Sequence, residues 1–178
     1  MFLHTFSDGG ARGNPGPAAI GVVICDAGGK VVREDADSIV RKMRINISGC
    51  PNSCGQHWIS DIGFYGNARK IDGPDGVKKE VPYYQMLLGG TAEEFGMAIQ
   101  SLPARLAPAA VLRVLAHFKA NRQEGESFRA YVMRHKVETF RSMTADLVKP
   151  ADLAPEMYRD WGDEVDYSLK LGRGECAA

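Results

Sequence analysis

Few cysteines, no excess of either charge and no long apolar run characterise this 178-residue sequence. Four irregularly spaced cysteines argue against the disulfide framework of a small secreted domain. The 22 basic and 22 acidic residues cancel, which removes the electrostatic case for binding nucleic acid or a membrane surface. No apolar run reaches the roughly 18 residues of a membrane span, and residues 1–5 lack the basic start of a signal peptide. These absences predict a cytoplasmic protein.

Local patterns predict an α+β fold. Short strands are expected at 2–6, 19–25 and 30–33, where turn formers separate β-branched runs, so residues 1–38 should form a β-hairpin or three-strand piece. Further strands are expected at 41–47, 59–65 and 83–88, with a helical turn after Cys54 and a loop tip at 73–76. Together these strands predict an antiparallel or mixed sheet.

Three to four helices are expected in the C-terminal half. Thr91 and Glu94 have the spacing of a capping box and predict a helix over 91–102. Its apolar stripe would be Phe95, Ala98, Ile99 and Leu102. Pro108 suits the first turn of a second helix, Ser127 caps a third, and a short fourth helix should run through Val137 and Phe140.

Cys50 and Cys54 are the residues most indicative of function. Glycines and a proline surround them, and thiolates are soft ligands that suit iron. A cubane cluster needs four such ligands, and the sequence has only Cys25 and Cys176 besides these two. The spacing by itself leaves two readings open, a metal site or two inert buried cysteines at a strand-to-helix corner.

The residues around this pair, NISGCPNSCGQH at 46–57, resemble the second cysteine motif of the sirohaem-containing sulfite and nitrite reductases. The resemblance spans about residues 41–178. It continues through SDIGFYG at 60–66, YQMLLGG at 84–90, RQEGESF at 122–128, DWGD at 160–163 and GEC at 174–176. Several separate motifs in the same order identify residues 39–178 as similar to the sirohaem and [4Fe–4S] domain of such a reductase.

This resemblance implies a site and a reaction. Cys50 would be a ligand of a [4Fe–4S] cluster, Cys54 would be shared between the cluster and the sirohaem iron, and Asn52 would help to seat the macrocycle. The family reduces sulfite to sulfide or nitrite to ammonia with six electrons, which ferredoxin or a flavoprotein supplies. His57 follows the motif and is expected to be a structural hydrogen-bonding residue rather than a ligand.

The sequence departs from that family in one important way. The upstream pair of cluster cysteines has no counterpart, and the basic residues that hold the substrate anion are also missing. Five basic residues could pair with some sirohaem carboxylates, or could be solvated charges beside strands: Arg41, Lys42, Arg44, Arg69 and Lys70. Cys176 does not correspond to a cluster ligand. The resemblance therefore implies an incomplete site that is not competent alone, or one that acts with a partner supplying the missing cysteines.

Residues 1–38 do not match the reductases. The segment FSDGGARGNPGPAAIGVV at 6–23 resembles the opening of the ribonuclease H family, where an Asp at the position of Asp8 binds the catalytic metal ions. An alternative function is therefore a metal-dependent nuclease or nucleic-acid-binding module using Asp8. Two-metal hydrolysis needs several carboxylates, and the sequence offers no counterpart for the others. A chimera of two segments, 1–38 and 39–178, is the simplest interpretation; a third possibility is an α+β domain without cofactor or activity.

Overall fold

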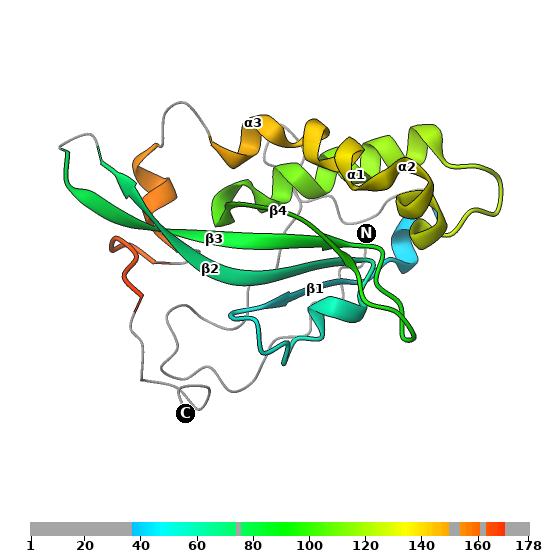
Figure 1. Ribbon diagram of the computed structural model, residues 1–178, viewed down its shortest axis with the longest axis horizontal. Coiled ribbons are helices and arrows are strands. Elements are labelled where there is room, and N and C mark those ends of the chain that lie inside the picture. The colour runs from blue at the N-terminus through cyan, green and yellow to red at the C-terminus, as the bar shows by residue number, and fades with distance from the viewer. Residues whose placement is uncertain (1–36, 74–75, 150–153, 161–162, 170–178) are drawn as a thin grey trace.

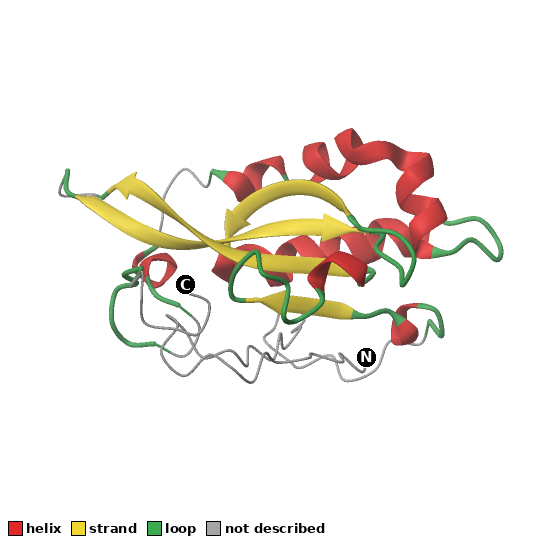
Figure 2. Cartoon of the chain, turned by 60° about the horizontal axis from the view of Figure 1, so that its bottom comes forward, coloured by secondary structure: helices red, strands yellow, loops and turns green. Residues whose placement is uncertain are grey.

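The computed structural model describes residues 37–73, 76–149, 154–160 and 163–169 of the chain. A four-stranded sheet lies at the centre of this part, with its strands in chain order. They are β1 (Ile45–Ser48), β2 (Ile62–Asp72), β3 (Lys78–Leu88) and β4 (Met97–Pro103). β1 runs parallel to β2, whereas β2–β3 and β3–β4 are antiparallel pairs. The mixed sheet is as predicted, and β1 is one of its two edge strands (Figure 2).

Three α-helices of the described part lie on one side of this sheet (Figure 1). They are α1 (Ala107–Asn121), α2 (Phe128–Met143) and α3 (Ala145–Val148). Both α2 and α3 contact β4, and α1 contacts α2. Short 3-10 helices are found at η1 (Val40–Lys42), η2 (His57–Ile59), η3 (Ala104–Leu106) and η4 (Pro155–Tyr158). The predicted α+β class is confirmed, and none of the described helices has the length and apolar character to cross a bilayer.

One apolar core joins the helices to the sheet. Phe64 and Met86 project from the strands, and Phe118, Tyr131 and Phe140 project from the helices; all five are fully buried or nearly so. Aromatic side chains carry much of the apolar area that a core removes from water. This core fixes the sheet whose edge carries the cysteines.

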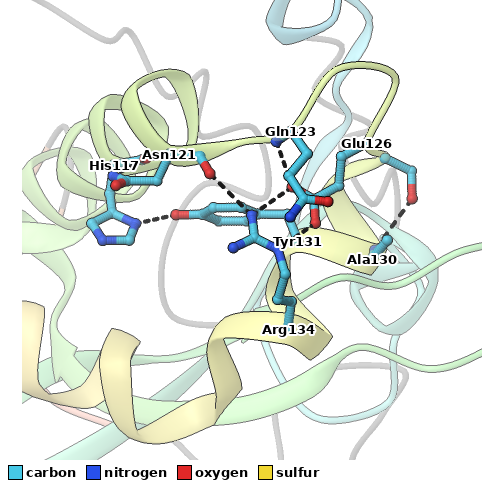
Figure 3. A network of polar contacts seen from close by, with 8 residues as sticks. His117, Asn121, Gln123, Glu126, Ala130, Tyr131 and Arg134 are labelled. Carbon is cyan, nitrogen blue, oxygen red and sulfur yellow. Dashed lines mark hydrogen bonds and ion pairs between the residues drawn. The ribbon is translucent and has the colours of Figure 1, made fainter.

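A polar network holds the connection between α1 and α2 (Figure 3). The Arg134 guanidinium donates to both Glu126 carboxylate oxygens at 2.7 Å, and this contact lowers the pKa of Glu126 to about 2. Beside this pair, the Tyr131 hydroxyl is hydrogen-bonded to His117 Nδ1 of α1. Ser127 Oγ accepts a backbone N–H from the first turn of α2, so its predicted role as N-cap is confirmed.

The third and fourth predicted helices are two parts of α2. Lys136 interrupts the helix with φ 62° and ψ 160°, a backbone conformation outside the helical region. Val137 and Phe140, which carried the prediction of a separate short helix, lie just beyond this break. The sequence therefore predicted both helical segments and their order.

The prediction of a helix over 91–102 is wrong. Thr91 Oγ1 does accept the N–H groups of Glu93 and Glu94, at 3.2 and 3.1 Å, but the cap closes only a turn. The chain then enters β4, which pairs with β3, and Phe95 is 70% exposed instead of buried in a helical stripe. Pairing with β3 outweighed the local helical pattern. The hydrogen bonds of a sheet depend on a partner strand that is distant in sequence, and the local pattern does not show that partner.

The other strand predictions differ at their boundaries. The strand expected at 41–47 begins only at Ile45, since η1 occupies 40–42. The strands expected at 59–65 and 83–88 become the longer β2 and β3, joined by a turn in which Gly76 N–H donates to Gly73 O at 2.9 Å. The strands predicted at 2–6, 19–25 and 30–33 lie outside the described residues, as does Asp8.

Candidate functional site

Residues 49–56, termed here the cysteine loop, connect β1 to η2 beside the sheet edge (Figure 1). Cys50 is half-buried and Cys54 is exposed, and neither is in a disulfide. Asn52, between them, is exposed as well. The structure therefore places all three predicted site residues on one loop, and neither cysteine is buried as the interpretation of two inert buried cysteines requires.

Side chains of β1 hold the base of this loop. Ser48 Oγ accepts the Gly55 N–H at 3.2 Å and lies 2.7 Å from His57 Nδ1. Two residues earlier on the same strand, Asn46 Nδ2 donates to Gln56 O at 3.3 Å. Alternate residues of a strand share one face, so both side chains reach the segment that leaves the loop. The last strand before Cys50 is thus tied to the residues after Cys54.

The backbone of the loop also lies close to the neighbouring strand. A Cβ on Gly66 of β2 would be 2.4 Å from Gly49 O, and one on Gly55 would be 2.5 Å from Ile47 O. Within the loop, Ser53 and Gln56 adopt positive φ angles of 62° and 56°. Such angles are uncommon outside glycine and occur where the surrounding structure enforces them. The loop is therefore closely wound against the sheet.

His57 lies beneath the loop in an aromatic environment. Its side chain is fully buried, and its ring centroid lies 5.4 Å from that of Trp58 and 5.0 Å from that of Tyr65. Burial lowers the pKa of His57 to about 4, because the charged imidazolium is disfavoured away from water. The ring is accordingly neutral at physiological pH. The prediction that His57 is a structural hydrogen-bonding residue is confirmed by its contact with Ser48.

The segment after the loop is anchored to the β3–β4 connection. Carbonyl groups of Trp58, Ser60 and Asp61 accept the N–H groups of Gly96, Gly90 and Gly89, at 2.7, 2.9 and 2.7 Å. Gly90 permits this approach because an added Cβ would lie 2.4 Å from Trp58 O. The motif at 84–90 thus supports the cysteine loop from a distance in sequence.

Basic side chains near the motif have structural partners. Arg44 donates to Ile59 O at 2.8 Å, and its own N–H binds the Asp61 carboxylate at 2.8 Å. Burial raises the pKa of that Asp61 carboxyl group. Arg69 stacks 4.8 Å over the Tyr83 ring, and Lys70 is 4.0 Å from Glu80. These contacts favour the interpretation of charges serving the fold.

The donor set fits half of a cubane cluster. Cys50 and Cys54 are two soft ligands at the rim of a stiff loop, but a [4Fe–4S] cluster held by cysteines needs four. Within the described ranges, no group of three or more His, Cys, Asp or Glu side chains could hold a metal ion. Cys25 and Cys176 lie outside those ranges. The described residues therefore account for one side of such a site.

Comparison with known families agrees with this geometry. Residues 33–169 match the family described as the nitrite and sulphite reductase 4Fe-4S domain. The chain belongs to this family. The match includes the cysteine loop, the strands of the sheet and all three helices.

Parts of the chain are similar to individual known proteins. A sulfite reductase [ferredoxin] of Mycobacterium tuberculosis is 35% identical over 114 residues, covering 54% of this chain and 18% of the relative. A chloroplastic ferredoxin–nitrite reductase of Oryza sativa is 35% identical over 94 residues, covering 50% and 15%. The solved structure of the Mycobacterium tuberculosis NirA protein covers 56% of this chain and 18% of its own, at 34% identity and a TM-score of 0.48. The chain spans less than a fifth of the length of the two reductases and of the NirA protein.

A different relative matches a short stretch. Ribonuclease HI of Halobacterium salinarum is 49% identical over 39 residues, which cover 22% of this chain and 20% of that protein. This is the family that the first 38 residues resemble. Because Asp8 lies outside the described residues, its role in a nuclease or nucleic-acid-binding module stays a prediction, as does the chimeric boundary near residue 38.

Two features of the site were not predicted from the sequence. Ser48, directly before the cysteine loop, hydrogen-bonds Gly55 and His57 at the far end of the loop, and Gly66 allows the loop to approach β2. Alternation along β1 could have placed Ser48 on the same face as Asn46. Nothing local could have indicated the contact of Gly66 with Gly49.

Proposed function

We propose that this chain forms the C-terminal part of a sirohaem- and [4Fe–4S]-dependent reductase of sulfite or nitrite. Cys50 and Cys54 would supply two of the four cluster thiolates, and Cys54 would also be the ligand of the sirohaem iron. The observation that supports this most is the cysteine loop itself, a wound loop at a sheet edge that carries one exposed and one half-buried thiol. Asn52, exposed on the same loop, would contact the macrocycle.

Substrate and donor follow from the relatives. The Mycobacterium tuberculosis and Oryza sativa proteins are named as ferredoxin-dependent reductases of sulfite and nitrite, respectively. A thiolate shared between two redox centres couples them, which suits repeated one-electron transfers into a bound oxyanion. We expect ferredoxin to be the donor, in the cytoplasm. The remaining two thiolates must come from outside the described residues, so we expect no turnover from this chain alone.

Ligand exchange tests the proposed ligands without requiring a complete site. The full chain is mixed anaerobically with a preformed [4Fe–4S] cluster carrying four small thiolates. Because the loop offers two thiolates, the chain should displace two small thiols per cluster and retain the visible absorption of the cluster on gel filtration. Cys50→Ser and Cys54→Ser should each reduce this displacement. Cys176→Ser, the matched control, should leave it unchanged.

Two results would contradict the proposal. One is displacement by the Cys50→Ser, Cys54→Ser double variant that equals that of the original chain. The other is the absence of any exchange with the original chain. Adding sirohaem to the loaded chain then tests the bridge, since thiolate-to-iron charge-transfer absorption should disappear in Cys54→Ser.

A further inference from the structure

The Ser48 hydroxyl lies where the two ends of the cysteine loop meet. It accepts the N–H of Gly55, one residue after Cys54, and contacts His57 Nδ1 at 2.7 Å. Ser48 itself precedes Cys50 by two residues and is 2% exposed. One buried hydroxyl therefore joins the residues before the first cysteine to those after the second.

The contact between Ser48 and His57 can form with either tautomer of His57. A serine hydroxyl has one proton to donate and two lone pairs that accept. If Ser48 donates to His57 Nδ1 and accepts from Gly55, the imidazole proton lies on Nε2, a buried atom with no hydrogen-bond partner among the described residues. If His57 Nδ1 donates instead, Ser48 accepts twice and its own proton needs another acceptor. In both arrangements the Ser48 hydroxyl bonds a neutral imidazole through Nδ1.

The remaining contacts of this region are also independent of any metal. Asn46 Nδ2 holds Gln56 O at 3.3 Å, and His57 O accepts the hydroxyl of Ser60 at 3.1 Å. The imidazole is wedged against the rings of Trp58 and Tyr65. The side chains that fix the base of the loop thus come from the sheet, from η2 or from its C-cap Ser60, and not from the loop they hold.

We propose that Ser48 and His57 are positioning residues, a hydroxyl–imidazole brace that holds Cys50 and Cys54 in the arrangement needed for ligation before any ligand binds. What the cysteines bind rests on the proposed function; the brace itself does not. A prearranged site binds with a smaller entropic cost than a loop that must be ordered on binding. The brace would therefore be a specific requirement for loading this site.

Nuclear magnetic resonance of the full, metal-free chain tests the brace directly. Long-range ¹H–¹⁵N spectra should show His57 as a neutral ring in one fixed tautomer at neutral pH, as a ring held through Nδ1 requires. Amide exchange at Gly55 should accelerate about tenfold in Ser48→Ala, the factor that corresponds to roughly 1.4 kcal/mol for one buried hydrogen bond. Exchange at Gly96, whose N–H binds Trp58 O at 2.7 Å, should not change. Exchange of the His57 ring between its two tautomers, or no effect at Gly55, would overturn the proposal.

Cysteine reactivity separates positioning from general stability. The alkylation rates of Cys50 and Cys54 are measured by mass spectrometry, and their ratio is compared among variants. Ser48→Ala should change this ratio. Ser101→Ala is the matched control, because Ser101 is a buried serine of β4 whose hydroxyl donates to Gln85 of β3 and accepts from Asn67 of β2. Equal changes in both variants would show that the loop responds to any loss of stability, and the brace would be rejected.

Two substitutions of His57 identify the nitrogen that matters. In His57→Asn, the amide can take the place of Nδ1 next to Ser48, whereas in His57→Gln it lies nearer the place of Nε2. We expect the Cys50 to Cys54 rate ratio and Gly55 protection to be retained in His57→Asn and lost in His57→Gln. If the rate ratio and the Gly55 protection are lost in both variants, His57 acts only through core packing and the brace is refuted.

Cluster exchange then connects the brace to the proposed function. If the chain displaces small thiols from a cluster, Ser48→Ala should slow this exchange more than Ser101→Ala does. If no variant or original chain exchanges, the proposed function fails while the metal-free measurements still decide on the brace. Equal slowing by the two variants would count against positioning.

Discussion

Replacing Gly66 by alanine is the sharpest perturbation of the cysteine loop that avoids the cysteines themselves. The new Cβ would be 2.4 Å from Gly49 O, 3.1 Å from Gly49 C and 3.6 Å from Gly49 Cα. All three are backbone atoms, so no flexible side chain can move aside. The residue that must yield is the one directly before Cys50.

The loss of unfolding free energy in Gly66→Ala follows from this geometry. Ordinary contacts begin near 3.4 Å, so the backbone of Gly49 must retreat by about 1 Å, and overpacking of this kind typically costs about 1–3 kcal/mol. Gly49→Ala is the matched control in the same loop, because nothing lies within 4 Å of its added Cβ. Loss of glycine flexibility in the unfolded chain should make that control neutral or about 0.4–1 kcal/mol more stable. The free energies of unfolding of the two variants should differ by about 1–4 kcal/mol.

Urea denaturation followed by far-ultraviolet circular dichroism measures this difference. Alkylation of Cys50 in the native chain should accelerate in Gly66→Ala, because the displaced backbone carries that residue outward. Equal unfolding free energies for Gly66→Ala and Gly49→Ala, with unchanged Cys50 reactivity, would refute the close packing of the loop on β2.

Two further predictions concern His57 and Ser127. Burial lowers the pKa of His57 from 6.5 to about 4, so the unfolded chain takes up this proton first as the pH falls. The stability due to this group is complete above pH 6.5 and declines toward pH 4 by about 3 kcal/mol. Urea titrations at several pH values should show that decline in the original chain and not in His57→Asn. Parallel curves of unfolding free energy against pH for the two proteins would contradict this prediction. Ser127→Ala removes the N-cap of α2 and should lower the unfolding free energy by about 1 kcal/mol. Ser142 is exposed, so Ser142→Ala should change the unfolding free energy by less than about 0.5 kcal/mol. Similar losses in both variants would argue against the cap.

Elements with strong local signals were predictable from the sequence. Pro108 and the apolar spacing of Val111, Leu115 and Phe118 located α1, and Ser127 located the start of α2. In each case the helix depends on residues three or four positions apart, which the sequence shows directly. The wrong prediction at 91–102 arose where the local helical pattern met a sheet edge supplied by β3.

The sequence by itself determined the family, through the motifs around Cys50 and Cys54 and those that follow them in order. It also determined the α+β class and the position of both cysteines on a loop after a strand. Only the tertiary structure decided that Ser48 and His57 tie the two ends of that loop together and that Gly66 lets it lie against β2. The reason is physical: periodicity and caps act between near neighbours, whereas strand pairing, close backbone approach and buried hydrogen bonds join residues that only the completed fold brings together.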